Sequence, residues 1–152
     1  MITITNNQPA IRVNELQLKA DAEQILSLFG YEDFDLGILL TTDDIIQNYN
    51  RTYRSKDKAT DILSFPYHTD LQPGQHITPQ TPDDKNIGDI IIALQYVHKD
   101  APNWGHTFEQ RMRVLLVHGI CHLLGYDHIT DEDYAIMKEK EEWLHNKLGI
   151  FV

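Results

Sequence analysis

Residues 114–128 of the chain read Val-Leu-Leu-Val-His-Gly-Ile-Cys-His-Leu-Leu-Gly-Tyr-Asp-His. From Val114 to Leu124, every residue except His118 and His122 is apolar or glycine, so a helix over this stretch is apolar around nearly its whole circumference. A helix of that kind is buried, whereas a surface helix carries a single apolar stripe. The stretch therefore predicts a buried helix that brings two imidazole rings into the protein interior.

The segments on either side of this helix alternate between strands and helices. Alternating apolar and polar residues predict strands, apolar residues at helical spacing predict helices, and Gly, Pro and Asp mark the ends of both. Strands are expected at residues 2–5, 34–40, 61–66 and 87–93, and the other helices at 14–29, 41–53, 94–101 and from 130 onward. Residues 67–86 form the one long irregular segment. This order predicts an α+β fold in which a small mixed four-stranded sheet packs with about five helices.

Length and composition predict one globular domain. Of the 152 residues, 41% are hydrophobic and 24% are charged, and no internal repeat or linker divides the chain. No apolar run approaches the ~20 residues that span a bilayer. The first residues lack the pattern of a signal peptide, and Cys121 is the only cysteine, which fits a reducing compartment. We therefore expect a cytoplasmic protein that contacts no membrane.

Three histidines have the spacing of metal ligands. His118 and His122 are four residues apart, which places both rings on one face of a helix. Gly125 can end that helix in a left-handed conformation, after which the chain can turn back and bring His128 to the same point. Three neutral imidazoles in this pattern predict one ion of zinc or another divalent transition metal on a buried C-terminal helix, with a fourth position open to water. The alternative is a set of core histidines, each bonded to a backbone carbonyl.

The residue after the first histidine separates two classes of metal-dependent hydrolase. A metal-bound water can become a nucleophile near neutral pH, so hydrolysis is the expected reaction class. Metzincin proteases share the histidine spacing but place a glutamate directly after the first histidine as general base. This chain has Gly119 there. A protease is therefore the less favoured alternative, and an anionic phosphodiester is the more suitable substrate.

Basic residues gather between positions 51 and 58, although the chain has a formal net charge of −10. Arg51, Arg54, Lys56 and Lys58 could hold a phosphate, and arginine suits this role because its planar fork matches two phosphate oxygens. The acidic balance predicts that the protein alone binds nucleic acid weakly, since such affinity comes from neutralising phosphates. DNA is not expected as a partner.

Three segments carry a pattern that extends beyond the histidines. They are residues 118–128 with the histidines, 50–66 with the basic residues, and 87–90. In sequence, order and spacing they resemble the YbeY family of bacterial metal-dependent endoribonucleases, and the resemblance covers residues 35–148. The resemblance implies a compact α+β fold, zinc held by the three histidines, and a catalytic role for Arg54. It also implies action in ribosomal RNA maturation and ribosome quality control.

Two further residues are candidates for the site. Asp127 could orient a histidine ring or accept a proton, since metal-bound imidazoles usually donate their second N–H to a carboxylate or a carbonyl; a turn aspartate is the alternative. Ser64, in the third predicted strand, could contact the substrate. Residues 131–142 carry six acids and two lysines, and we interpret them as solvated surface.

Together these features predict a zinc-dependent, single-strand-specific endoribonuclease in which residues 1–152 form a single metal-dependent hydrolase domain. Arg54 is expected to clamp the scissile phosphate, and Arg51, Lys56 and Lys58 to bind RNA. Single-stranded or ribosomal RNA is the expected substrate, delivered through the small ribosomal subunit or a ribosome-associated protein. The alternatives are a zinc metalloprotease-like hydrolase and a non-catalytic factor that binds a maturing ribosome.

Overall fold

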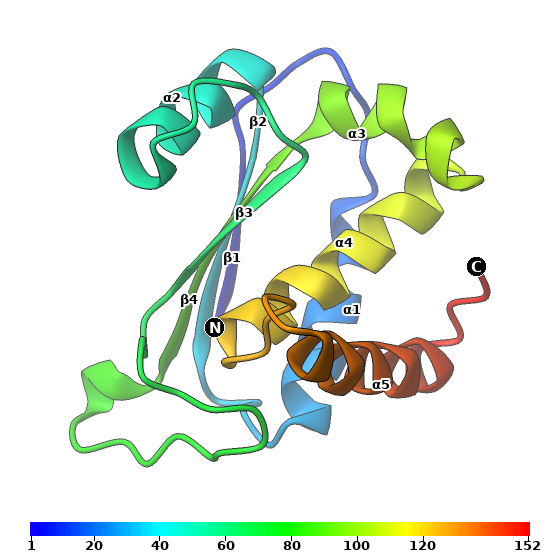
Figure 1. The fold of residues 1–152 in the computed structure, drawn as a ribbon. Coiled ribbons are helices and arrows are strands. Elements are labelled where there is room, and N and C mark those ends of the chain that lie inside the picture. The colour runs from blue at the N-terminus through cyan, green and yellow to red at the C-terminus, as the bar shows by residue number, and fades with distance from the viewer.

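The computed structural model describes all of residues 1–152 and contains one four-stranded mixed sheet (Figure 1). Across the sheet the strands are β1 (Ile2–Asn6), β2 (Asp35–Thr41), β4 (Asn86–Ala93) and β3 (Ile62–Pro66). Strands β1, β2 and β4 are parallel, whereas β3 is antiparallel to β4 and forms one edge. The predicted α+β class and the mixed four-stranded sheet are confirmed.

Five α-helices cover the sheet unevenly. They are α1 (Glu15–Leu28), α2 (Asp43–Arg54), α3 (Leu94–Asp100), α4 (Phe108–Leu123) and α5 (Asp131–Leu148). Figure 1 shows α1, α4 and α5 on one face of the sheet and α2 on the other, near one end. None of these helices has the length and apolarity that crossing a membrane requires.

Two short 3₁₀ turns add to the predicted elements: the first lies in the irregular segment 67–86, and the second begins at the last residue of the helix predicted at 94–101. They span Pro82–Asp84 and Ala101–Trp104. In both, a proline occupies the first or second position, where its fixed φ suits a helical turn and its missing N–H would have had no helical partner. Local proline geometry therefore adds a turn that the pattern of apolar residues does not indicate.

Helix α4 carries the histidine segment and lies in the main hydrophobic core, which contains 28 buried residues. Nine residues of α4 are buried, and a capping box between Thr107 and Gln110 closes its N-terminus. The predicted buried helix is thus confirmed. On the opposite face, α2 covers a smaller cluster of four buried residues.

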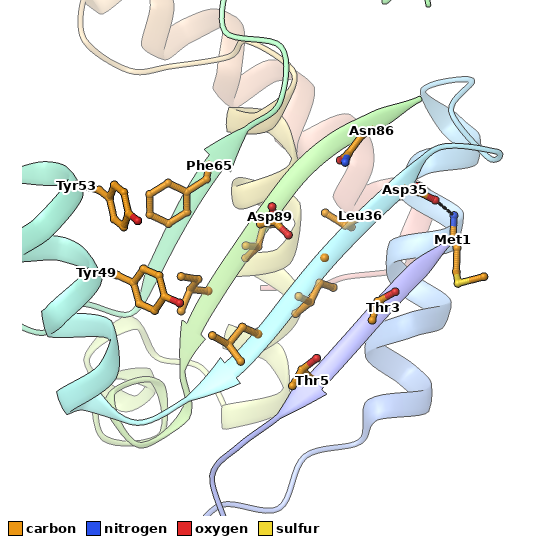
Figure 2. Close-up of a pocket in the computed structure, with 15 residues that line it drawn as sticks. Met1, Thr3, Thr5, Asp35, Leu36, Tyr49, Tyr53, Phe65, Asn86 and Asp89 are labelled. Atoms are coloured by element: carbon orange, nitrogen blue, oxygen red, sulfur yellow. Dashed lines mark hydrogen bonds and ion pairs between the residues drawn. The ribbon is translucent and has the colours of Figure 1, made fainter. Parts of the chain in front are cut away.

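The sheet face that α2 leaves uncovered forms an open hollow (Figure 2). Thr3 and Thr5 of β1 and Asp89 of β4 point to this side, and the Asp89 carboxylate occupies the space that a Cβ on Gly37 would need. Parallel strands are usually covered on both faces and apolar throughout. Here the open face explains why exposed threonines alternate with half-buried isoleucines along β1.

The long loop between β3 and β4 packs against the turn that follows α4. Gly125 in that turn has a φ of +96°, which side chains rarely adopt, and a Cβ there would overlap the carbonyl oxygen of Leu71 in the loop. The positive φ agrees with the conformation predicted for Gly125. The glycine also allows the loop to lie directly on the end of α4.

Replacing Gly125 with alanine is expected to lower the free energy of unfolding by about 2–5 kcal/mol, because a strained backbone adds to a displaced loop. Gly149 is the matched control: its φ is +68°, but no atom lies within 4 Å of where its Cβ would be. Gly149→Ala should therefore lower the free energy of unfolding by only about 1–2 kcal/mol. Urea denaturation of both variants tests this, and equal losses would contradict the packing role of Gly125.

Candidate metal centre

The three predicted ligand histidines converge at the C-terminal end of α4. One ring nitrogen from each of His118, His122 and His128 belongs to a group whose ligand atoms all lie within 4.8 Å of one another. The Nε2 atoms of His118 and His122 are 3.0 Å apart, so both point at one position. Since His118 and His122 are half-buried and His128 is exposed, the triad could hold a metal ion at the protein surface.

A tight turn after α4 brings His128 back to the helix. The backbone N–H groups of Leu124 and Tyr126 both donate to the carbonyl oxygen of Cys121 at 3.1 Å, with the positive-φ Gly125 between them. The Tyr126 side chain is buried in the core and anchors the turn. The third histidine therefore follows a turn fixed by main-chain bonds and by one buried ring.

Two of the rings are held by the nitrogen that faces away from the shared position. His122 Nδ1 lies 2.9 Å from the Tyr126 carbonyl oxygen, and His118 Nδ1 lies 3.0 Å from Oε2 of Glu141 on α5. Because a carbonyl oxygen can only accept, His122 Nδ1 donates a proton to it and Nε2 keeps its lone pair. Burial lowers the pKa of His122 to about 4, so this ring is neutral at pH 7 and can bind a metal.

Cys121 and Asp127 lie within the histidine segment but make other contacts. Cys121 is fully buried, and burial raises the pKa of its thiol, so it is a protonated core residue. Oδ1 of Asp127 accepts a hydrogen bond from the backbone N–H of Ile129 at 3.2 Å, which is the bond of a turn aspartate. Asp127 nevertheless lines the same pocket as the histidines.

Glu141 is a residue of the site that the sequence did not indicate. It belongs to residues 131–142, for which the sequence predicts solvated surface, and that prediction is wrong at this position because only 19% of its side chain is exposed. The carboxylate that touches a ligand ring is therefore supplied by α5.

Gly119, next to the first histidine, packs directly on the sheet. A Cβ at this position would lie 2.9 Å from Cδ1 of Ile62, 3.0 Å from Cδ1 of Ile90 and 3.3 Å from Oγ of Ser64. Because all three atoms are the ends of side chains, a larger residue at position 119 would require these side chains to shift. The site therefore has a closely packed glycine where the metalloproteases place their glutamate.

The histidines share a pocket with residues of α2 and β3. Arg54, the last residue of α2, and Ser64 of β3 are among the residues that line it. Nη2 of Arg54 donates to the carbonyl oxygen of Ser64 at 2.7 Å, and its guanidinium lies 4.9 Å from the ring centroid of Phe65. These two contacts fix a cation in the same pocket as the histidines.

The other predicted RNA-binding residues lie outside this pocket. Arg51 is 3.9 Å from Asp57, and Lys56 and Lys58 are exposed in the segment that follows α2. None of these three basic side chains lines the pocket. Of the four basic residues between positions 51 and 58, only Arg54 is brought to the histidines.

Known proteins resemble this chain over nearly its whole length. The family model described as endoribonuclease YbeY matches residues 3–149. The chain belongs to the YbeY family. It is 36% identical over 149 residues to the human endoribonuclease YbeY, covering 97% of this chain and 88% of the human protein. It is 38% identical over 153 aligned positions to endoribonuclease YbeY of Carboxydothermus hydrogenoformans, with 99% of each chain covered.

A protein of Thermotoga maritima, known from its solution structure, has the same fold. The TM-score is 0.57 at 23% identity, and the match covers 97% of this chain and 91% of the other. The YbeY family is one of endoribonucleases, which are hydrolases of RNA phosphodiester bonds. The resemblance detected in three segments of the sequence is thus confirmed over nearly the whole chain.

The lowered pKa of His122 predicts how pH affects the metal-free protein. Between pH 6.5 and about 4, the imidazole of residue 122 is protonated in the unfolded chain but stays neutral in the folded protein. Acidification through this window therefore favours unfolding. His122→Gln lacks this group. We expect the stability of the wild type relative to the variant to fall by about 1–2 kcal/mol over the window, because the partial exposure of the ring reduces the full effect.

Urea denaturation at pH 7 and at pH 4, with a chelator present, measures this difference. All other titratable groups are shared by the two proteins. A stability difference that does not change with pH would contradict a buried neutral ring at position 122.

Proposed function

We propose that this chain is a zinc-dependent endoribonuclease that cuts single-stranded RNA in the cytoplasm, with residues 1–152 acting as one hydrolase domain. The observation that carries the proposal is the shared pocket: the three histidines and Arg54 line it together, although they come from distant parts of the sequence. Membership of the YbeY family supports RNA as the substrate. The donor set supports zinc, because three neutral imidazoles with an open side suit a catalytic zinc site.

Different residues of the site would bind the metal and the phosphate: the histidines hold the metal, and Arg54 holds the phosphate. A bound zinc ion would polarise a phosphodiester and lower the pKa of a bound water towards neutrality. His122 offers its Nε2 lone pair at pH 7 without first losing a proton, since burial keeps its pKa at about 4. Asp127 is proposed as a proton acceptor because its half-buried carboxylate lines the pocket beside His128.

Arg54 is proposed as the phosphate clamp. Its bond to the Ser64 carbonyl uses one N–H of Nη2, and the remaining guanidinium N–H groups are available for two phosphate oxygens. Because Phe65 and Ser64 already hold the side chain, little conformational entropy is lost when RNA binds. The Ser64 hydroxyl, beside Gly119, is a further contact for the substrate.

The acidic character of the chain bears on how RNA arrives. With a formal net charge of −10, the protein alone is expected to bind RNA weakly. We therefore propose that the small ribosomal subunit or a ribosome-associated protein delivers it to its substrate during ribosomal RNA maturation and quality control. Arg51, Lys56 and Lys58 would attract RNA from outside the pocket, since they are exposed near Arg54.

Arg54→Ala should lower kcat/KM for a single-stranded RNA by about 10²–10³-fold while zinc content stays unchanged, because a donor to the developing charge is lost. Arg54→Lys should restore only part of the activity, since lysine has no planar fork. Arg51→Ala removes the same charge from the same helix, but outside the pocket, so kcat should stay close to wild type and only KM should rise, because this residue attracts RNA without holding the scissile phosphate. His118→Ala should bind zinc much more weakly and lose cleavage.

Three outcomes would contradict the proposal in different ways. If the metal-loaded wild type cuts no RNA and a variant that lacks a ligand histidine still complements a deletion strain, the chain is a non-catalytic maturation factor. If it cleaves casein in a chelator-sensitive manner but not RNA, it is a protease-like hydrolase. If Arg51→Ala lowers cleavage as much as Arg54→Ala, the clamp is a diffuse charge effect.

A further inference from the structure

Glu141 occupies an unexpected position on α5. The buried stripe of this helix consists of Met137, Leu144 and Leu148, and Glu141 lies on the same stripe, four residues after the first and three before the second. Its side chain is 19% exposed, while the neighbouring Glu142 is exposed. A carboxylate on an apolar face costs free energy unless something binds it. Its ion-pair partner in the structure is a ring of the metal centre.

That contact determines which nitrogen of His118 faces the metal position. Oε2 of Glu141 lies 3.0 Å from His118 Nδ1. An ionised carboxylate can only accept, so Nδ1 carries the proton and Nε2 keeps its lone pair. The same Nε2 lies 3.0 Å from Nε2 of His122, at the point where the ligand atoms converge. The hydrogen bond therefore sets both the tautomer and the direction of the ring.

The three ligand rings are supported differently. Glu141 supports His118 with a charge, the Tyr126 carbonyl supports His122 with a dipole, and His128 is exposed. A carboxylate partner raises the basicity of an imidazole more strongly than a neutral carbonyl does, because the donated proton is held by a full negative charge. His118 should then be the ligand whose affinity depends most on its partner.

From these contacts we infer that Glu141 is a positioning residue of the metal centre, which acts through His118 and does not touch the substrate. The inference rests on the metal site of the proposed function. It also ties α5 to the metal: the ion holds His118 of α4, and His118 holds Glu141 of α5. Metal binding should therefore slow hydrogen exchange in α5 around residue 141 in the wild type.

Glu141→Gln tests the inference with zinc alone, so no RNA is needed. The variant keeps the size of the side chain and loses its charge, and its zinc affinity should fall about 10–100-fold in competition with a chromophoric chelator. Glu142→Gln removes the same charge one residue away on the exposed side and should bind zinc as the wild type does. The visible absorption spectrum of the cobalt-loaded protein should change for Glu141→Gln and not for Glu142→Gln.

A second comparison asks whether Glu141 acts through His118. In the His118→Ala background, adding Glu141→Gln should not weaken zinc binding further. In the His122→Ala background it should still do so. If Glu141 merely supported the fold, Glu141→Gln would instead lower the stability of the metal-free protein and leave the cobalt spectrum unchanged. Its effect on zinc affinity would then be the same in both histidine backgrounds.

The outcomes separate this inference from the nuclease proposal. Equal zinc affinities of Glu141→Gln and Glu142→Gln would overturn the positioning role, even if the wild type cuts RNA. If the wild type binds zinc more tightly than Glu141→Gln by the predicted factor but cuts no RNA, only the nuclease proposal is overturned. A wild type that takes up less than half an equivalent of zinc would overturn the metal centre and the role of Glu141 with it.

Discussion

Helix α4 packs at Gly119 directly against side chains of strands β3 and β4. The space of the missing Cβ is bounded by two isoleucine side chains and by the hydroxyl of Ser64. The carbonyl of the same serine accepts the hydrogen bond from Arg54. Ser64 thus contacts both the helix that carries the ligand histidines and the arginine that lines the same pocket. This edge strand therefore connects the two halves of the pocket lining.

The uneven cover of the sheet explains how Arg54 reaches the pocket. Helix α2 lies on the face opposite α4 (Figure 1), and Phe65 points to that same face (Figure 2). Ser64, its neighbour on the edge strand β3, lines the pocket on the other face. Arg54 ends α2, stacks on Phe65 and bonds the main chain of Ser64 at the strand edge. The site therefore draws ligands from one side of the sheet and its cation from the other.

The parts of the site that the sequence predicts are those set by local geometry. The spacing of His118 and His122 fixes their relation on any helix, and a glycine three residues later is enough to anticipate the turn to His128. Charge alone could not separate Arg54 from Arg51, because the difference lies in a strand edge that only one of them reaches. The role of Glu141 depends on how α5 packs on α4, which no local pattern specifies.

A signal for Glu141 was nevertheless present. Met137, Glu141, Leu144 and Leu148 follow helical spacing, so a charged residue interrupts an otherwise apolar stripe. The acidic composition of the whole segment concealed this, since Glu142 and Glu139 beside it are ordinary surface residues. The position of a charge relative to the apolar face is thus more informative than the number of charges in the segment.

Because Cys121 is buried, a cysteine introduced at the pocket would be the one readily reactive thiol of the protein. The only thiol of the chain is enclosed in the core and protonated, so it reacts slowly with alkylating reagents. Thr69 is exposed at the rim of the pocket, in the loop that Gly125 allows to pack on α4. A cysteine introduced at Thr69 would carry a fluorophore beside the histidines of the otherwise unmodified native chain. Its emission would then report occupancy of the pocket.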